Sequence, residues 1–471
     1  MTKILFDATE LSYFLEESGH RAGVFFVALN LFRELKKRKD VELVFCCNFK
    51  RYYFLKEVIE KVKEFQGIEL LKENSLINLA FAKLNYLAEC KQTKQSPPLE
   101  GGEAVLFERK RKLEMQGWGH SANNPTPKSK ISTLPQGAGS SKLKYAILSL
   151  SRYYENIFYK QNKKNIEELK DFEIYFSPFQ APSVEILHSK HLKRFRMIHD
   201  IIPILEAGKI PTNKGLWCYR IYNTINQNDF YVTNSECTRK DVLKYFDIKE
   251  ENIKTTLLGA DATFTPPLNP NLSGNNTQLF PSAESQGAGK PTKYVFSLCT
   301  LGKRKNLIFA IKNFFTFIEK NKINDLKLVL AGGVWEKFKK ELTNTIGDFD
   351  QSKIEVLGYV KDEELPRLYS NALMFIYPSL YEGFGLPVLE AMKCGCPVIT
   401  SNVSSLPEVI GQAGIQINPT NDEELIEAYE KMYYDNFFRE LCIERGLIRA
   451  KNFSWEKCAS ELLEFIETKC V

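Results

Sequence analysis

The sequence predicts an α/β protein with two halves, each built on a parallel sheet. Short apolar segments that suit buried strands alternate with longer segments that have helical periodicity. Such alternation implies parallel strands joined by right-handed crossovers. The chain has 471 residues and 44% of them are hydrophobic, which is enough for two domains of ordinary size with large cores.

One strand–helix junction combines carboxylates with glycines. Glu382 and Glu390 flank a glycine turn that opens a helix, and Pro387 suits the first turn of that helix. Gly383 and Gly385 allow the backbone to come close to a ligand. The free N–H groups of a helix start favour a phosphate, and carboxylates accept hydrogen bonds from hydroxyls. The junction therefore predicts a site for a nucleotide-sugar, with an ordinary helix start as the alternative.

The stretch Pro378-Ser-Leu-Tyr-Glu-Gly-Phe-Gly-Leu-Pro-Val-Leu-Glu-Ala391 resembles the retaining glycosyltransferases of family 4. The resemblance implies the GT-B fold, in which two Rossmann-like domains with parallel sheets face an interdomain cleft and a C-terminal helix crosses back to the first domain. It also implies that Glu390 holds the ribose hydroxyls and that Glu382 holds hydroxyls of the transferred sugar. The backbone expected beneath that sugar belongs to Gly383, Phe384, Gly385 and Leu386.

A second stretch, Leu298-Cys-Thr-Leu-Gly-Lys-Arg-Lys-Asn-Leu307, resembles the basic segment of the same family. It follows an apolar strand at residues 294–298, so Arg304 and Lys305 are expected at the carboxyl end of that strand, where such sheets bind ligands. Their charges are suited to stabilising a diphosphate leaving group. The family has Glu-Pro where this chain has Gly302-Lys303, and a solvated basic turn is the alternative.

The resemblance assigns residues near the nucleobase and the sugar. Tyr359 and Val360 follow a strand at residues 354–357 and correspond to backbone that contacts the nucleobase. His199, in a His-Asp-Ile-Ile-Pro segment at the end of a strand, is expected near the anomeric centre, where it helps to orient the sugar. A lone His is more often structural, and that interpretation stays open.

A glycine loop lies between a first strand at residues 3–6 and an apolar helix at residues 24–35. It resembles the family's glycine loop, which lies across the cleft from the donor. Gly19 and Gly23 are therefore candidates for contact with a phosphate or with the acceptor. A plain turn explains the same pattern equally well.

The resemblance and the composition together set the expected domain limits. Two segments, residues 91–142 and 272–293, are rich in Pro, Gly, Ser, Asn or charge, and we predict that they are disordered inserts, with an acceptor-binding lid as the alternative. The expected parts are an acceptor-side domain at residues 1–265, a linker at 266–290, a nucleotide-sugar domain at 291–450 and a crossover helix at 451–471.

The resemblance implies a front-face reaction without a covalent enzyme intermediate, in which the departing phosphate deprotonates the attacking hydroxyl. It implies neither a general base nor a metal cofactor. Asp348-Phe-Asp350 has the Asp-x-Asp pattern that binds metal and diphosphate in the other major glycosyltransferase fold, but there it follows an apolar strand. Here the strand at residues 354–357 comes after it, so we predict a polar connector and no catalytic metal.

The residues around His199 and Arg304 are similar to those of mannosyltransferases of surface polysaccharide and O-antigen assembly. This similarity favours GDP-mannose as the donor, with UDP- and dTDP-sugars left open, and a glycan or polyprenyl-linked glycan as the acceptor. Other possibilities of the same fold are an epimerase, a sugar phosphorylase and an inactive sugar-binding subunit. A dinucleotide oxidoreductase is excluded because residues 19–24 lack the Gly-x-Gly-x-x-Gly pattern.

Two basic stretches, residues 50–65 and 142–164, carry apolar or aromatic residues among their lysines. Either stretch suits an anionic membrane surface, although a core-facing helix with solvated lysines is favoured for the first. No nucleic-acid-binding motif accompanies them. No apolar run is long enough to cross a bilayer and residues 1–7 lack a signal-peptide core, so we expect a cytosolic protein, free or peripheral on the cytosolic face of the membrane.

Overall fold

The computed structural model divides into two compact units. It describes residues 2–15, 23–48, 51–71, 83, 168–213, 216, 218–266, 293–298, 302–333 and 335–470. The first unit comprises Met1–Arg196 and Ala207–Ile225, and the second comprises Met197–Glu206 and Asn226–Val471. The insert at 91–142, the basic stretch at 142–164 and all but the last residue of the insert at 272–293 lie outside the described residues. The domain limits stated above stay a prediction.

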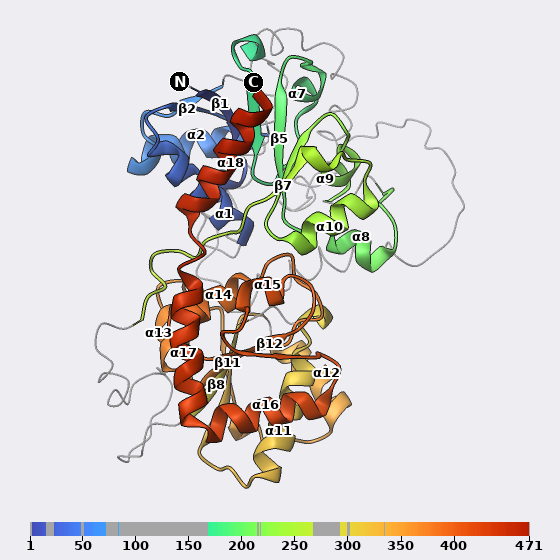
Figure 1. Cartoon of the computed structure of the whole chain (residues 1–471), viewed down its shortest axis with the longest axis vertical. Helices are drawn as coiled ribbons and strands as arrows, with labels where there is room; N and C mark the ends of the chain where they lie inside the picture. Colours follow the sequence, from blue (N-terminus) through green and yellow to red (C-terminus); the bar gives the residue numbers. More distant parts are fainter. Residues whose placement is uncertain are drawn as a thin grey trace, which may run out of the picture. The chain divides into compact units, whose positions relative to one another are not determined.

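A seven-stranded parallel sheet is built from the amino-terminal part of the chain (Figure 1). Its strand order is β3-β2-β1-β4-β5-β6-β7, and β1 pairs in parallel with both β2 and β4. Its elements are β1 (Thr2–Asp7), η1 (Glu10–Tyr13), α1 (Gly23–Lys36), β2 (Val41–Cys46), α2 (Tyr52–Lys61), η3 (Lys63–Phe65), β3 (Glu69–Leu70), η5 (Leu169–Asp171), β4 (Ile174–Ser177), α7 (Val184–His188), β5 (Lys193–Ile198), α8 (Ile202–Ala207), α9 (Tyr219–Asn223), β6 (Phe230–Thr233), α10 (Glu236–Tyr245), η6 (Glu250–Asn252) and β7 (Ile253–Thr255).

The apolar face of the basic stretch at residues 50–65 is part of the core of the first unit. Leu55 and Val58 of α2 are fully buried. Phe65 of η3 stacks on Phe32 of α1, with 5.0 Å between the ring centroids. Burial of these side chains stabilises the unit through the hydrophobic effect, so the membrane interpretation of this stretch has no support from its apolar residues.

A six-stranded parallel sheet forms the second half of the architecture. Its strand order is β10-β9-β8-β11-β12-β13. Its elements are β8 (Lys293–Leu298), η8 (Lys303–Lys305), α11 (Leu307–Lys320), β9 (Leu326–Ala331), α12 (Trp335–Ile346), η9 (Gln351–Lys353), β10 (Ile354–Gly358), α13 (Leu365–Asn371), β11 (Met374–Tyr377), α14 (Leu386–Lys393), β12 (Val398–Ser401), α15 (Leu406–Ile410), β13 (Ile415–Ile417), α16 (Asp422–Tyr434) and α17 (Asn436–Ala450).

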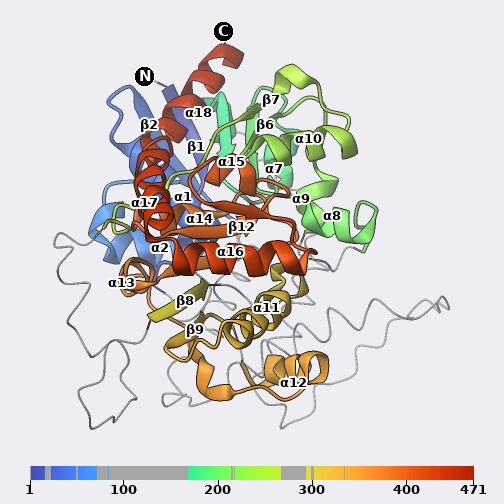
Figure 2. The ribbon, with the colours of Figure 1, turned by 60° about the horizontal axis from the view of Figure 1, so that its bottom comes forward.

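Helices cover both faces of this sheet because alternate strand residues point to opposite sides. On one face, Val295 and Ile376 belong to a core cluster with residues of α11 and α16, which pack together (Figure 2). On the other face, Phe296 and Phe375 contact Tyr369 of α13, with ring centroids 5.3 Å and 5.1 Å away. Both faces are thus apolar, which explains the continuous apolar runs in these strands.

Each sheet has one point where the chain changes the direction in which it adds strands. In the seven-stranded sheet the point lies between β1 and β4, because β2 and β3 are added on one side of β1 and β4 to β7 on the other. In the six-stranded sheet it lies between β8 and β11. Open α/β sheets bind ligands outside the carboxyl ends of the strands at such switch points.

The last helix, α18 (Trp455–Cys470), packs on β6 and β7 of the seven-stranded sheet. The rings of Phe465 and Phe230 lie 6.2 Å apart, and Glu464 pairs with Lys254 at 2.7 Å. This placement confirms the predicted return of the C-terminal helix to the first sheet. Within the described parts of the chain, no helix is both long and apolar enough to span a membrane.

Candidate functional site

The candidate site lies at the switch point of the six-stranded sheet. One of its loops follows β8 and contains η8, which carries Arg304 and Lys305. The other follows β11 and leads through Glu382 and a glycine turn into α14. The two loops converge because β8 and β11 are parallel neighbours whose carboxyl ends lie at the same edge of the sheet.

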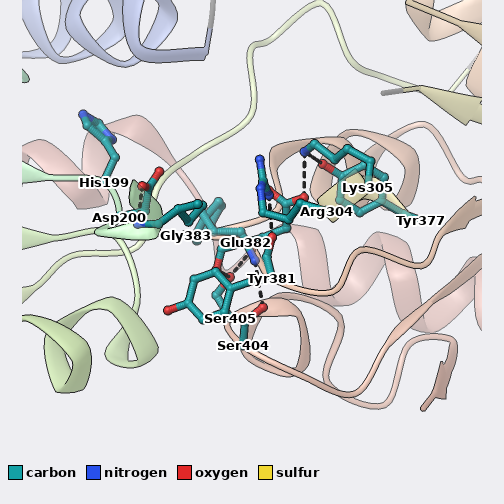
Figure 3. Close-up of polar contacts among 12 residues, drawn as sticks. His199, Asp200, Arg304, Lys305, Tyr377, Tyr381, Glu382, Gly383, Ser404 and Ser405 are labelled. Atoms are coloured by element: carbon teal, nitrogen blue, oxygen red, sulfur yellow. Dashed lines mark hydrogen bonds and ion pairs between the residues drawn. The ribbon is translucent and has the colours of Figure 1, made fainter. Parts of the chain in front are cut away.

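Glu382 pairs with both basic residues at once (Figure 3). Its Oε2 lies 2.8 Å from Nη1 of Arg304, and its Oε1 lies 2.6 Å from Nζ of Lys305. Lys305 also donates a hydrogen bond to the Tyr377 hydroxyl at 2.5 Å, and Arg304 donates one to the backbone carbonyl of Tyr381. The side chains of all three charged residues are largely buried. The structure thus brings three of the predicted site residues together, and their roles stay a prediction.

The pairing fixes the charge state of the cluster. Burial alone favours the neutral form of Glu382, but the charges of Lys305 and Arg304 outweigh it and lower the pKa of this carboxyl below its usual value. Burial also opposes the charge of Arg304, but the carboxylate of Glu382 raises the pKa of the guanidinium. Two basic side chains thus face the carboxylate of Glu382, and such a pair of basic groups suits a diphosphate.

The glycine turn has no room for larger residues. A Cβ on Gly383 would collide with the backbone carbonyl of His199 and would lie 2.9 Å from Cβ of Asp200. Gly385 is the N-cap of α14 with a φ of 117°, and a Cβ there would lie 2.8 Å from Leu406. Pro387 occupies the first turn of the helix, as predicted. The close approach at Gly383 in the structure is to the protein's own backbone, and contact with a ligand stays a prediction.

Three serine hydroxyls hold this turn, and none of them was predicted as a site residue. Ser404 accepts a hydrogen bond from the backbone N–H of Glu382 at 3.0 Å. Ser405 lies 2.9 Å from the carbonyl of Glu382, and Ser235 donates to the carbonyl of Gly383 at 2.7 Å. Each serine satisfies a backbone group that would otherwise lose hydrogen bonding on burial. No local pattern around Ser404 or Ser405 signals this role.

Glu408 is a further residue that sequence reasoning missed. Its two carboxylate oxygens accept hydrogen bonds from the backbone N–H groups of Glu236 and Cys237 at 2.8 Å and 2.7 Å. A carboxylate at a helix N-terminus satisfies unpaired donors and complements the helix dipole. Glu408 therefore joins α15 to the start of α10, the helix whose cap residue, Ser235, holds Gly383. Nothing in the residue spacing indicates a partner so distant in the sequence.

Glu390 lies on α14 in a separate environment. It is half-buried, and the Tyr369 hydroxyl donates a hydrogen bond to its Oε2 at 3.0 Å. Burial raises the pKa of Glu390 to about 7, and the charges of Asp362 and Asp261 act in the same direction, against the Tyr369 hydrogen bond. Asp362 follows Tyr359 and Val360 in the chain, so their loop lies on the Glu390 side of the site.

The remaining predicted residues differ in how closely they approach this cluster. His199 follows β5, and Figure 3 shows its imidazole directed away from Glu382 while its carbonyl lies beside Gly383. Tyr359 directly follows β10 and is 71% exposed. Phe384 is buried against Phe453, with the rings 6.0 Å apart, so its side chain belongs to the core.

Three predicted residues remain, namely Gly19 and Gly23 of the sequence segment 18–24 and Leu386. Gly23 is the first residue of α1 and is exposed, whereas Gly19 lies outside the described residues. Leu386 begins α14 and is half-buried.

In the Asp-x-Asp segment, Asp350 caps η9 by accepting hydrogen bonds from Ser352, which fits the predicted polar connector.

We predict that Gly383→Ala destabilises the protein by about 1–3 kcal/mol, because the new methyl group displaces the His199 carbonyl or the turn. Thermal unfolding of the full-length protein measures this change. Gly302→Ala is the matched control, since a Cβ at Gly302 meets nothing within 4 Å and its φ is −89°. Equal melting temperatures for the two variants would show that the tight contact at Gly383 is absent.

Known proteins resemble this chain in sequence. Residues 281–448 match the family described as glycosyl transferases group 1. O-antigen chain mannosyltransferase B of Escherichia coli is 32% identical over 304 residues, which are 63% of this chain and 74% of that protein. Serotype-specific mannosyltransferase WbdA of Escherichia coli is 27% identical over 272 residues, but these are 56% of this chain and only 32% of that longer protein.

Solved structures share the architecture at low sequence identity. Anabaena Alr3699/HepE, in complex with UDP and glucose, superposes with a TM-score of 0.59 at 13% identity and covers 99% of this chain and 100% of its own. Sucrose-phosphate synthase of Thermosynechococcus elongatus gives a TM-score of 0.58 at 14% identity, with 99% of each chain covered. These likenesses confirm the predicted GT-B class of α/β fold. Together with the match to the Escherichia coli mannosyltransferase, they lead to one conclusion: the chain belongs to the glycosyl transferases group 1 family.

Proposed function

We propose that the protein is a retaining mannosyltransferase that uses GDP-mannose to extend a glycan in surface-polysaccharide synthesis. The observation that carries this proposal is the cluster of Glu382, Arg304 and Lys305 at the switch point of the six-stranded sheet. The choice of mannose is supported by relatives whose names describe O-antigen and serotype-specific mannosyltransferases.

Arg304 and Lys305 would bind the diphosphate. As the bond between the sugar and the phosphate breaks, negative charge grows on the leaving oxygen, and two oriented cations stabilise it. Their ion pairs with Glu382 hold both side chains in place before the donor arrives, which limits the reorganisation needed in the reaction. This positive charge performs the task that a divalent metal has in other transferases, so we propose that no metal cofactor is required.

Glu382 would also bind the transferred sugar. Its lowered pKa keeps it ionised at neutral pH, so it accepts hydrogen bonds from sugar hydroxyls. In a front-face reaction the C1–O bond to the phosphate breaks and a new bond forms from C1 to the acceptor oxygen on the same face. The acceptor's proton passes to the departing phosphate, and GDP leaves. We propose that His199 lies near C1 and helps to orient the sugar.

Glu390 would hold the ribose, and the backbone at Tyr359 and Val360 would contact the nucleobase. The charge of Asp362 acts on the carboxyl of Glu390, so Glu390 lies near the loop that follows β10. This proximity supports the assignment. We propose that Gly19 and Gly23 contact the acceptor, and that the acceptor is a polyprenyl-linked glycan at the cytosolic face of the membrane.

The donor is tested by thermal unfolding with GDP-mannose, UDP-glucose, UDP-GlcNAc and dTDP-rhamnose, each with and without EDTA. A ligand that binds only the folded protein at 100 times its Kd adds about 2.7 kcal/mol of stability. We expect this stabilisation with GDP-mannose alone, and we expect it to survive EDTA. Stabilisation by another nucleotide-sugar would replace the proposed donor, and its loss in EDTA would contradict the metal-free site.

Replacement of Glu382 separates binding from chemistry. We expect Glu382→Gln to lower kcat for mannose transfer by roughly 100-fold, because an oriented charged contact to the reacting sugar is lost. Stabilisation by GDP is expected to persist, since Arg304 and Lys305 remain. Glu430→Gln is the matched control because Glu430 forms an ion pair of 2.9 Å with Lys320 outside the site. Transfer at the wild-type rate in Glu382→Gln would refute the assignment.

The pKa of Glu390 predicts how donor binding depends on pH. A carboxyl whose pKa is about 7 in the folded protein is mostly protonated at pH 6 and ionised at pH 8. Because the ribose hydroxyls bind the ionised form, the Kd for GDP-mannose should be about tenfold higher at pH 6 than at pH 8. GDP-mannose suits this titration because its diphosphate has no group that titrates in this range. The Glu390→Gln variant should bind GDP-mannose more weakly than the wild type, and its Kd should be the same at pH 6 and pH 8. A wild-type Kd that is the same at the two pH values would contradict the role of Glu390.

A further inference from the structure

The seven-stranded sheet has a switch point of its own, and polar side chains meet there as they do in the second sheet. Glu10 follows β1 and Gln180 follows β4, the two strands on either side of the switch point. Nε2 of Gln180 donates a hydrogen bond to Oε1 of Glu10 at 2.5 Å. The position corresponds to that of Arg304, Lys305 and Glu382 in the six-stranded sheet. This correspondence is one of topology and does not depend on how the two units are placed.

A buried cluster of polar side chains around Asp7 lies next to the pair in the chain. Asp7, the last residue of β1, is only 6% exposed. Its Oδ1 accepts hydrogen bonds from the hydroxyl and the backbone N–H of Thr9 at 2.6 Å and 3.1 Å, and its Oδ2 accepts one from the Tyr175 hydroxyl at 2.8 Å. Burying a carboxylate is unfavourable unless such partners are present. The hydrogen bonds of Asp7 therefore fix the backbone just before Glu10.

Arg51 holds the short helix that begins with Glu10. Its side chain is buried and donates to the hydroxyl of Ser12 at 2.8 Å and to the carbonyl of Ser12 at 3.2 Å. Its guanidinium also lies 3.9 Å from the ring centroid of Tyr13. Ser12 and Tyr13 belong to η1, the short helix that begins with Glu10. Gln180 is fixed in turn, because the Ser177 hydroxyl donates to its carbonyl at 2.8 Å.

The rigid pair keeps hydrogen-bonding capacity. Glu10 and Gln180 are half-buried, and within the described residues neither Oε2 of Glu10 nor Oε1 of Gln180 has a hydrogen-bond partner. Two neighbouring acceptors and one remaining amide N–H match two adjacent hydroxyls of a sugar. A phosphate is disfavoured because Glu10 presents a carboxylate, whereas the nearby Arg51 is held by Ser12 and Tyr13. The chemistry selects a neutral polyol.

We propose that Glu10 and Gln180 form the acceptor subsite and bind adjacent hydroxyls of the terminal, uncharged sugar of the glycan. This inference rests on the proposed function and deepens it, because it assigns the acceptor to named residues of the first unit. The alternative is that the Gln180–Glu10 hydrogen bond only joins the two loops. That alternative predicts a change in stability and no selective change in acceptor binding.

Binding of p-nitrophenyl α-mannoside to the full-length protein tests the subsite without catalysis. Saturation-transfer NMR is expected to detect the sugar with the wild type and to lose at least about 90% of the signal with Glu10→Gln and with Gln180→Met. The control Glu34→Gln, which removes an exposed ion pair of 2.6 Å with Lys37 in the same unit, is expected to bind as the wild type does. Absence of binding by the wild type, or undiminished binding by both subsite variants, would overturn the proposal.

Kinetics then separate this subsite from the donor site. We expect both variants to raise the KM for the mannoside by about 10- to 100-fold, as expected for a lost hydrogen bond to a charged group. The KM for GDP-mannose and its slow hydrolysis by water should stay within about twofold of the wild type, because neither process uses the acceptor subsite. Equal changes in the two KM values, or a melting temperature lowered by more than about 4 °C, would show a structural role instead.

The two proposals can fail separately. If the wild type neither transfers mannose nor hydrolyses GDP-mannose, the proposed function fails, while the NMR experiment still decides whether Glu10 and Gln180 bind a sugar. If transfer occurs but the variants keep the wild-type KM for the mannoside, the acceptor subsite lies elsewhere and the proposed function stands.

Discussion

The pairing of one carboxylate with two cations organises the carboxyl edge of the six-stranded sheet. Glu382 comes from the loop after β11, and Arg304 and Lys305 come from the loop after β8, so their mutual attraction helps to join two loops that are also linked by a backbone hydrogen bond from the N–H of Leu380 to the carbonyl of Arg304 at 2.8 Å. In a largely buried place this attraction is strong, but removing one partner leaves a charge without compensation. The glycine turn, its serine hydrogen bonds and the carboxylate of Glu408 all serve to keep Glu382 at this position.

Much of this arrangement follows from sequence because it depends on local chemistry. The alternation of strands and helices predicts parallel sheets, and β1, β8 and β10 lie within a residue or two of the expected ranges. The resemblance assigned Arg304 and Lys305 to the diphosphate and Glu382 to the sugar of one donor, and the structure brings the three side chains together. Their direct ion pairs add a detail that spacing does not contain, since it depends on which side chains turn toward each other.

Other features depend on contacts between distant parts of the chain. Glu408 binds the start of α10, and Ser235 binds the carbonyl of Gly383, although no pattern near either residue indicates a partner. Gly383 was expected to admit a ligand, and the structure shows that it admits the backbone at His199. The burial of Asp7 was equally hidden, because one Asp at the end of a strand has the same sequence signature whether it is exposed or enclosed.

The position of α18 has a consequence for dividing the protein into parts. Cys458 of this helix contacts Thr256, just beyond β7, and Phe465 contacts Phe230 at the start of β6. The side chains of Cys458 and Phe465 are both buried. A fragment that starts at Lys293 would contain the whole six-stranded sheet, yet it would present these side chains to water without their covering strands. Such a fragment would tend to self-associate through α18. Studies of the donor-binding half in isolation are better served by a fragment that ends after α17.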